Sequence, residues 1–353
     1  MNSTNKLNRS FTSMIADLFP GYFSLVMATG IISIASFLLE VHVVAWGLFL
    51  FNIPAYIILW VLFILRLWKF PERVVADFKN HGRSASFFTL VAGTCILGSQ
   101  FVVIAHQYAV AVGLWFLGLL LWLFLTYAFF TIVTTIQSKP SLEQGLTGTW
   151  LLSIVATQSL SVLGTLLASQ GGEEQSLLLF FNLCLYLSGG MIYILIITLI
   201  FYRFTFLPIV KETLTPPFWI NMGAVAVTTL AGSLLILNAE RWSLLAELLP
   251  FLKGFTLFFW ATATWWIPLL LLLGVWRHLL QHFPLRYDPQ YWGMVFPLGM
   301  YTVCTFRLAN ALQLPFLMVI PRSFIFIAWI AWLLVFLGYV HSVVQHILVS
   351  RSD

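Results

Sequence analysis

The sequence predicts an all-α polytopic membrane protein in which ten transmembrane helices form five helical hairpins around a central pore, lined by the odd-numbered helices. Three observations support this fold class. Of the 353 residues, 61% are hydrophobic and only 8% are charged, against about 25% charged residues in a soluble domain. Ten apolar runs are long enough to cross a bilayer as helices. The odd-numbered runs are rich in small and polar residues, and the even-numbered runs are not.

The ten runs follow one another with short gaps, so we expect residues 1–353 to form a single transmembrane domain. A short cytoplasmic segment, at about residues 1–20, should precede the first run, which has no small-residue cleavage pattern after it. The expected helices are 21–39, 43–65, 87–105, 110–132, 146–167, 177–201, 218–237, 255–276, 291–312 and 324–347.

The basic residues predict the orientation, because cytoplasmic loops of membrane proteins are enriched in Lys and Arg. Three basic residues fall on one side: Arg241, Lys253 and Arg322. Thirteen fall on the other: Lys6, Arg9, Arg66, Lys69, Arg73, Lys79, Arg83, Lys139, Arg203, Lys211, Arg277, Arg286 and Arg351. Both termini should therefore be cytoplasmic, with the protein in the plasma (inner) membrane.

The contrast between odd and even runs predicts an inner and an outer set of helices. Small residues let membrane helices approach closely, and hydroxyl or amide groups in hydrocarbon need partners. The odd runs all begin on the cytoplasmic side, about 60 to 75 residues apart, so the inner helices should be parallel repeats. For any single run, the alternative is that its polar residues only serve helix packing. Our candidates for the pore lining are Thr29, Thr94, Gln100, Thr157, Gln158, Asn221 and Thr228.

The ninth run contains the residues that we expect to control passage. Pro297 lies near its middle, and Arg307 is a charge inside an apolar span. A membrane helix tolerates an internal proline or cation only where neighbouring helices or a wet cavity satisfy it. This helix should therefore face a polar interior. The alternative for Arg307 is a place at the outer headgroups or an ion pair with a loop carboxylate.

Phe296 is the candidate for a block in the pore. It follows Arg286 by ten residues, a rise of about 15 Å in a helix, which predicts a position near the middle of the membrane. Pro297 comes directly after it, and a proline kink would aim the ring at the pore axis. The alternative is ordinary packing of a phenylalanine against lipid or core.

Three motifs resemble those of a known family. They are FPGYF at residues 19–23, LP at 207–208 with LTP at 214–216, and FP at 296–297 followed by the basic Arg307. With the number of spans and the odd-even pattern, these motifs resemble the tellurite-resistance/dicarboxylate transporter family over nearly the whole chain. That family includes plant slow-type anion channels, the bacterial tellurite-resistance protein TehA and fungal malate and sulfite transporters.

The resemblance implies five hairpins around a central pore and a homotrimer with one pore per subunit. It also implies that the ring of Phe296 plugs the pore. The position that matches Arg307 is basic in the slow-type channels as well, which implies an electropositive pore mouth that concentrates anions.

Two functions stay open at this point. No Asp or Glu lies inside the ten runs, whereas coupled carriers commonly use an intramembrane carboxylate. The first function is therefore a gated anion channel for chloride, nitrate or similar ions, occluded by Phe296. The second is a carrier, with or without proton coupling, of a C4-dicarboxylate such as malate, or of sulfite or tellurium oxyanions.

Other chemistries have little support in the sequence. It contains no G-x-S-x-G, P-loop or H-E-x-x-H motif, and its basic residues form no patch. We therefore expect no enzyme activity, no metal, no other cofactor and no nucleic acid; the expected partners are small anions and the lipid bilayer. The cysteines and histidines lack metal-ligand spacing and should serve packing. They are Cys95, Cys184, Cys304, His106, His278, His282, His341 and His346.

Overall fold

The computed structural model describes residues 12–171 and 175–352, and within these ranges the regular elements are all helices. This confirms the predicted all-helical fold. Nine helices of the described chain are long and apolar enough to cross a membrane, judged by length and composition. The helix α13 (Trp292–Ala311) is not among them, because Arg307 and Asn310 lower its mean hydropathy. Lys6 and Arg9, used above to predict the orientation, lie outside the described residues.

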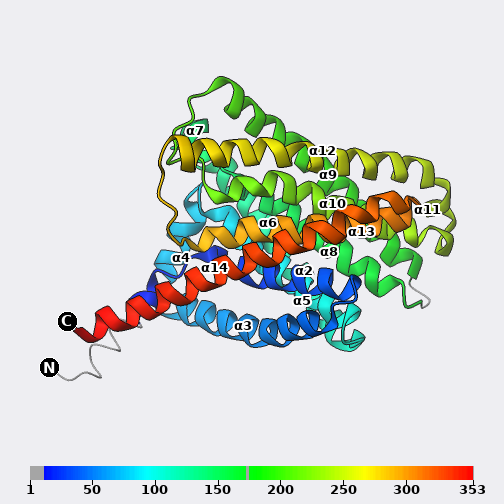
Figure 1. Ribbon diagram of the computed structural model, residues 1–353, viewed down its shortest axis with the longest axis horizontal. Helices are drawn as coiled ribbons and strands as arrows, with labels where there is room; N and C mark the ends of the chain where they lie inside the picture. The colour runs from blue at the N-terminus through cyan, green and yellow to red at the C-terminus, as the bar shows by residue number, and fades with distance from the viewer. Residues whose placement is uncertain (1–11, 172–174, 353) are drawn as a thin grey trace.

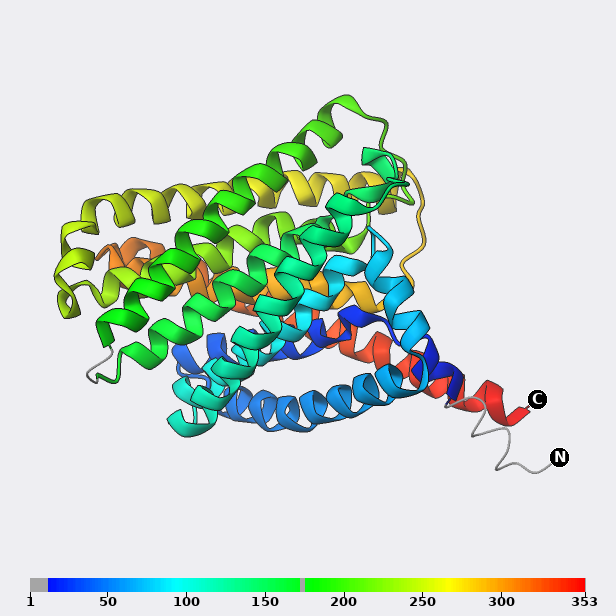
Figure 2. The same cartoon turned by 180° about the vertical axis from the view of Figure 1, so that it is seen from behind.

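Among the described residues, ten helices have 15 or more residues, and they run roughly side by side along the longest axis of the molecule (Figures 1 and 2). They fall into two sets. The inner helices are α2 (Ser24–Leu38), α5 (Phe88–Val103), α8 (Leu152–Ala168), α10 (Ile220–Leu237) and α13. The outer helices are α3 (His42–Lys69), α6 (Tyr108–Thr135), α9 (Gln175–Phe206), α12 (Leu249–Val275) and α14 (Val319–Ser352).

Burial separates the two sets clearly. Between 83% and 94% of the residues in the apolar stretches of α2, α5, α8 and α10 are buried, and 16 of the 20 residues of α13 are buried as well. In the five outer helices the share is only 17% to 44%. Leu, Ile, Phe and Trp side chains make up the exposed surface of the outer helices, which is the composition that suits a lipid-facing helix.

The inner helices contact one another in a closed cycle. α2 packs against α5, α5 against α8, α8 against α10, α10 against α13, and α13 against α2. Each inner helix also packs against the outer helix that follows it in the chain. The cycle places α13, the last inner helix, beside α2, the first (Figure 1).

Every inner helix begins with a short 3₁₀ turn. These turns are η1 (Pro20–Phe23), η2 (Ser84–Phe87), η3 (Gly148–Leu151), η4 (Pro216–Trp219) and η7 (Pro289–Tyr291). The remaining elements connect the helices: α4 (Pro71–Lys79), α7 (Leu142–Gly145), η5 (Ala239–Arg241), α11 (Ser243–Glu247), the π-helix η6 (Trp276–Leu280) and η8 (Pro315–Met318).

Three buried arginines, on the outer helices α3 and α9 and on the π-helix η6 that follows α12, hold the segments that lead into the inner helices. Each guanidinium donates to a backbone carbonyl in the segment that leads into the preceding inner helix of the chain. The protein itself therefore solvates the buried charge. The pairs are Arg66 Nε with the Ala16 carbonyl at 3.2 Å, Arg277 Nε with the Lys211 carbonyl at 2.9 Å, and Arg203 Nη1 with the Leu146 carbonyl. These bonds fix where three of the five inner helices begin.

The starts of α8 and α10 approach so closely that only glycine fits between them. A Cβ atom at Gly148 would lie 2.3 Å from the carbonyl oxygen of Pro217. We expect Gly148→Ala to destabilise the protein by about 1 to 3 kcal/mol through overpacking. In detergent, its melting temperature should fall by several degrees below that of the native protein.

Gly113→Ala is the matched control for this prediction. Gly113 lies on α6, and no heavy atom comes within 4 Å of a Cβ placed there. This variant should melt at or slightly above the native temperature, since alanine favours helix more than glycine does. Equal melting temperatures for the two variants would contradict the close approach of the two helix starts.

Candidate functional site

Two small cavities lie along the axis of the inner helices, and all five inner helices line both. The helix-start cavity is lined by Phe19, Gly21, Ser24, Met27, Ser86, Thr89, Thr149, Leu152, Pro217, Ile220, Gln290, Gly293 and Phe296. The helix-end cavity is lined by Ile31, Ile34, Ile96, Ser99, Val103, Ser159, Val162, Leu166, Val227, Leu230, Leu234, Met300, Val303 and Arg307. On every inner helix, the residues that line the first cavity precede those that line the second.

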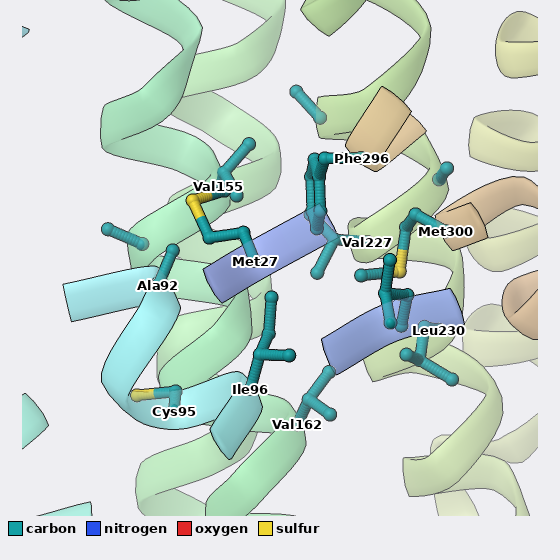
Figure 3. Packing of buried hydrophobic residues seen from close by; sticks show 14 of the residues in the cluster. Met27, Ala92, Cys95, Ile96, Val155, Val162, Val227, Leu230, Phe296 and Met300 are labelled. Carbon is teal, nitrogen blue, oxygen red and sulfur yellow. The ribbon is translucent and has the colours of Figure 1, made fainter. Parts of the chain in front are cut away.

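An apolar layer separates the two cavities. Side chains from all five inner helices gather there, with Met27 of α2, Ala92 of α5, Val155 of α8, Val227 of α10 and Phe296 of α13 among them (Figure 3). Each of the five is at most 1% exposed. The axis is therefore blocked by hydrocarbon at this level.

Phe296 closes the helix-start cavity from the side of this layer. Its ring is fully buried. Pro297 lies against α10, where a Cβ atom at Gly223 would come within 2.7 Å of Pro297 Cγ. Because proline has no N–H, the carbonyl of Gly293 loses its helical donor one turn earlier. Pro297 thus combines a tight helix contact with a local break in the hydrogen bonding of α13, directly beside the Phe296 ring.

Phe296 is the fifth residue of α13, and the helical rise used to estimate its depth in the membrane does not hold for the whole segment after Arg286. That estimate treated the ten residues after Arg286 as helical, but residues 282–288 have no helical structure and η7 begins at Pro289. The distance along the helix from Trp292 to Phe296 is about 6 Å. The position of Phe296 near the middle of the membrane therefore stays a prediction.

Arg307 lies in the same helix, about 16 Å beyond Phe296 at the helical rise of 1.5 Å per residue. Its side chain is partly buried and lines the helix-end cavity. It makes no hydrogen bond or ion pair with any described residue. A guanidinium without a protein partner, at a cavity of otherwise apolar and hydroxyl side chains, is available to an anion.

The seven residues that the sequence suggested for the pore lining are buried, but they are not among the lining residues of either cavity. Thr29, Thr94, Thr157, Gln100 and Gln158 bond to outer helices instead. Thr228 bonds to the Ala224 carbonyl of its own helix at 2.7 Å. The side-chain amide of Asn221 has no partner among the described residues.

A repeated hydrogen bond explains this placement. An aromatic group on each outer helix bonds to the inner helix of the following hairpin. Four of these bonds reach a threonine hydroxyl and one reaches a backbone carbonyl. They are Tyr56 OH with Thr94 at 2.8 Å, Trp122 Nε1 with Thr157 at 2.8 Å, Tyr193 OH with the Asn221 carbonyl at 3.3 Å, Trp260 Nε1 with Thr305 at 3.0 Å, and Trp332 Nε1 with Thr29 at 2.9 Å.

Apart from Arg307, the polar residues that line the cavities, Gln290 among them, were not proposed from the sequence as lining residues. Ser24, Ser86, Thr89 and Thr149 lie at the helix starts, and Ser99 and Ser159 lie further along α5 and α8. The sequence contained part of the information needed to find these residues. The first turns of the odd runs contain Ser, Thr and Gly, and a buried helix start needs hydrogen-bond partners for its backbone N–H groups. Nothing in the runs, however, marked which face of a helix points to the axis.

No cysteine, and no histidine whose side chain the structure describes, is among the lining residues of either cavity, and the side chain of His346 lies outside the described residues. Cys95 and Cys304 are buried, and Cys184 is exposed on α9. His278 Nδ1 lies 2.9 Å from the Phe283 carbonyl at the end of the π-helix. In the described part of the chain, no three His, Cys, Asp or Glu side chains gather as a metal site would require.

Comparison with known proteins shows which family model the sequence matches. Residues 17–340 match the model of the SLAC1 family, which is described as voltage-dependent anion channel. An uncharacterized membrane protein of Mycobacterium tuberculosis is 34% identical over 150 residues, which cover 42% of this chain and 76% of the relative.

Two relatives from Methanocaldococcus jannaschii match over more of the chain. Both are named uncharacterized transporters. One is 25% identical over 296 residues, which cover 82% of each protein. The other is 23% identical over 304 residues, which cover 83% of this chain and 85% of the relative.

The position of Thr157 can be tested directly. Thr157→Val removes the acceptor of Trp122 Nε1 while keeping the shape of the side chain. We expect a loss of stability of about 0.6 to 1.7 kcal/mol, the range for hydrogen bonds between membrane helices, and a lower melting temperature. Any anion flux should be unchanged, because Thr157 lines neither cavity. A change in anion selectivity without a change in melting temperature would instead favour the sequence-based lining role.

Proposed function

The chain belongs to the SLAC1 family and is a membrane transporter of anions; on this premise, we propose that it is a gated anion channel in which Phe296 closes a central pore. The observation that carries this proposal is the pair of axial cavities, each lined by all five inner helices, with Phe296 in the apolar layer between them. A conduit that is interrupted at a single layer needs only the movement of a few side chains to open.

The size of the cavities supports a closed conformation. Each leaves about 20 Å³ open to the centre of a water molecule, and about 10 to 15 Å³ is needed to hold one water. A hydrated anion does not fit. A hydrophobic constriction of this kind can hold a pore closed by excluding water.

The same proposal takes α13 as a tenth membrane span and the fold as five hairpins around the pore. It is supported by the closed cycle of inner helices and by the burial of α13, which removes Arg307 from lipid. A homotrimer with one pore per subunit stays a prediction from the family resemblance, as do the plasma membrane location and the cytoplasmic termini.

The channel proposal is favoured over a carrier by the lining residues. None of the residues that line the two cavities is Asp or Glu, and Arg307 is the cation among them. A dicarboxylate would leave one of its charges without a cationic partner in this conduit. The carrier of malate, sulfite or tellurium oxyanions is therefore kept as the alternative outcome of the experiment below.

The main test removes the Phe296 ring. In planar bilayers with a chloride gradient, Phe296→Ala should conduct severalfold more current than the native protein, because the apolar layer loses its largest side chain. The reversal potential should follow the chloride gradient.

Phe259→Ala is the control for the cavity that such a truncation creates. Phe259 is also fully buried, but it packs on α12 against Tyr186 and Tyr193, away from both cavities. Both variants should lose stability, by about 3 to 5 kcal/mol for a buried phenylalanine, while Phe259→Ala stays as silent as the native protein. Silent bilayers for all three proteins, together with saturable uptake of malate or sulfite into liposomes, would reject the channel in favour of the carrier.

A second test concerns the charge of Arg307. In the Phe296→Ala background, Arg307→Gln should reduce chloride conductance at low ionic strength and have little effect near 1 M salt, where the Debye length is about 3 Å. Arg307→Lys keeps the charge and should conduct nearly as well as arginine. A salt-independent loss in both variants would assign Arg307 a structural role.

A further inference from the structure

The helix-start cavity is lined by a hydroxyl group that has no part in the proposed gate. The hydroxyl of Ser86 lines this cavity, its side chain is 1% exposed, and it has no hydrogen-bond partner among the described residues. The other three hydroxyls of the lining are satisfied: Ser24 donates to the Gly21 carbonyl at 2.6 Å, Thr89 donates to the Ser86 carbonyl at 2.7 Å, and Thr149 bonds to the Thr147 hydroxyl at 2.6 Å. A buried donor without an acceptor is destabilising, so the cavity offers a place for an acceptor.

The backbone makes the same cavity electropositive. The five inner helices, each continuous with its 3₁₀ turn, all start around it. The first N–H groups of a helix have no partner inside the helix, and each helix start carries about half a positive charge. At η1, η2, η3 and η4 no side chain caps the helix start. Some of the first N–H groups are missing or already bonded, because η4 begins with two prolines and the Ser86 N–H donates to the Arg83 carbonyl at 2.9 Å, so the field of the helix dipoles is the main backbone contribution.

The side chains near the rim fit this picture. The Arg83 guanidinium lies 5.9 Å from the centre of the Phe19 ring, which lines the cavity. Arg83 also forms an ion pair with Asp77, in which Arg83 Nε lies 3.1 Å from Asp77 Oδ1. The fifth helix start is the exception, because Asp288 caps it by accepting from the Gln290 N–H at 2.8 Å. Asp288 is not among the lining residues.

We propose that the helix-start cavity is a binding site for one small monovalent anion, such as a halide or nitrate, held by the Ser86 hydroxyl and the uncapped starts of the inner helices. This proposal rests on the proposed function, since it adds a binding site to the same pore on one side of Phe296. The open space of about 20 Å³ fits a single small ion and not an extended dicarboxylate.

The test looks for the ion itself. Crystals of the native protein soaked in bromide should show an anomalous peak in the helix-start cavity, within hydrogen-bonding distance of Ser86 Oγ. In Ser86→Ala the peak should be lost or strongly reduced, and in Ser86→Thr, which keeps the hydroxyl, it should persist. Melting temperatures close to the native value would establish that these small substitutions leave the fold intact.

Ser84→Ala is the matched control. Ser84 belongs to the same 3₁₀ turn, is also 1% exposed and also has an unpartnered hydroxyl, but it does not line the cavity. Its bromide peak should equal that of the native protein. A native cavity without bromide, or equal peaks in native protein and Ser86→Ala, would overturn the proposed site.

Conduction provides an independent readout. In the Phe296→Ala background, Ser86→Ala should raise the bromide concentration for half-maximal current by about tenfold, the loss expected for one hydrogen bond to a charged group. The two proposals fail separately. If Phe296→Ala stays silent but bromide binds at Ser86, the gate is rejected and the site stands. If Phe296→Ala conducts but no bromide binds, the site is rejected and the gate stands.

Discussion

The arrangement depends on how a membrane protein satisfies hydroxyl groups where water is absent. An aromatic N–H or O–H on each outer helix bonds to the inner helix of the next hairpin, and this happens at all five junctions of the cycle. In hydrocarbon no water can replace these bonds, so they favour one rotation of each inner helix and one order of the hairpins. Once these hydroxyls are turned outward, the side of each inner helix that faces the axis is left mostly apolar. The apolar layer around Phe296 is therefore a consequence of the same bonds that close the cycle.

Composition predicted the two sets of helices because contact with lipid requires apolar side chains along a whole span. The outer runs had to be Leu, Ile, Phe and Trp, and the inner runs had to be small, and both signals survive averaging over about 20 residues. Composition does not tell which side of an inner helix faces the axis. Whether Thr157 points to the axis or to α6 depends on Trp122, which lies 35 residues earlier in the chain, and for Thr29 the partner Trp332 is 303 residues away. A single run cannot contain that pairing, and so the predicted lining residues and the observed ones differ. The depth of Phe296 in the membrane stays a prediction, because the segment before η7 is not helical and the count of residues from Arg286 does not give that depth.

The two ends of the axis are made electropositive by different means. At the helix-end cavity the positive charge belongs to one side chain, Arg307, which can be substituted and which is screened where it meets solvent. At the helix-start cavity it comes from the backbone of five helices that all point the same way, and no single substitution removes it. Parallel repeats produce this second field automatically, whereas the alternating directions of an inverted repeat would cancel it. If the proposed site binds an anion, the shared direction of the inner helices is itself a source of anion preference.

Hydroxyls and helix dipoles suit a conduit better than a buried cation would. Passage requires an ion to be bound well enough to lose water and weakly enough to leave again. A guanidinium or ammonium next to Phe296 would be costly to bury without a partner and would hold an anion tightly once paired. One unpartnered serine and several partial charges at helix starts give a weaker attraction that is spread around the axis. With Arg307 kept about 16 Å beyond Phe296 along α13, the full charge can gather anions at one mouth without trapping them at the apolar layer.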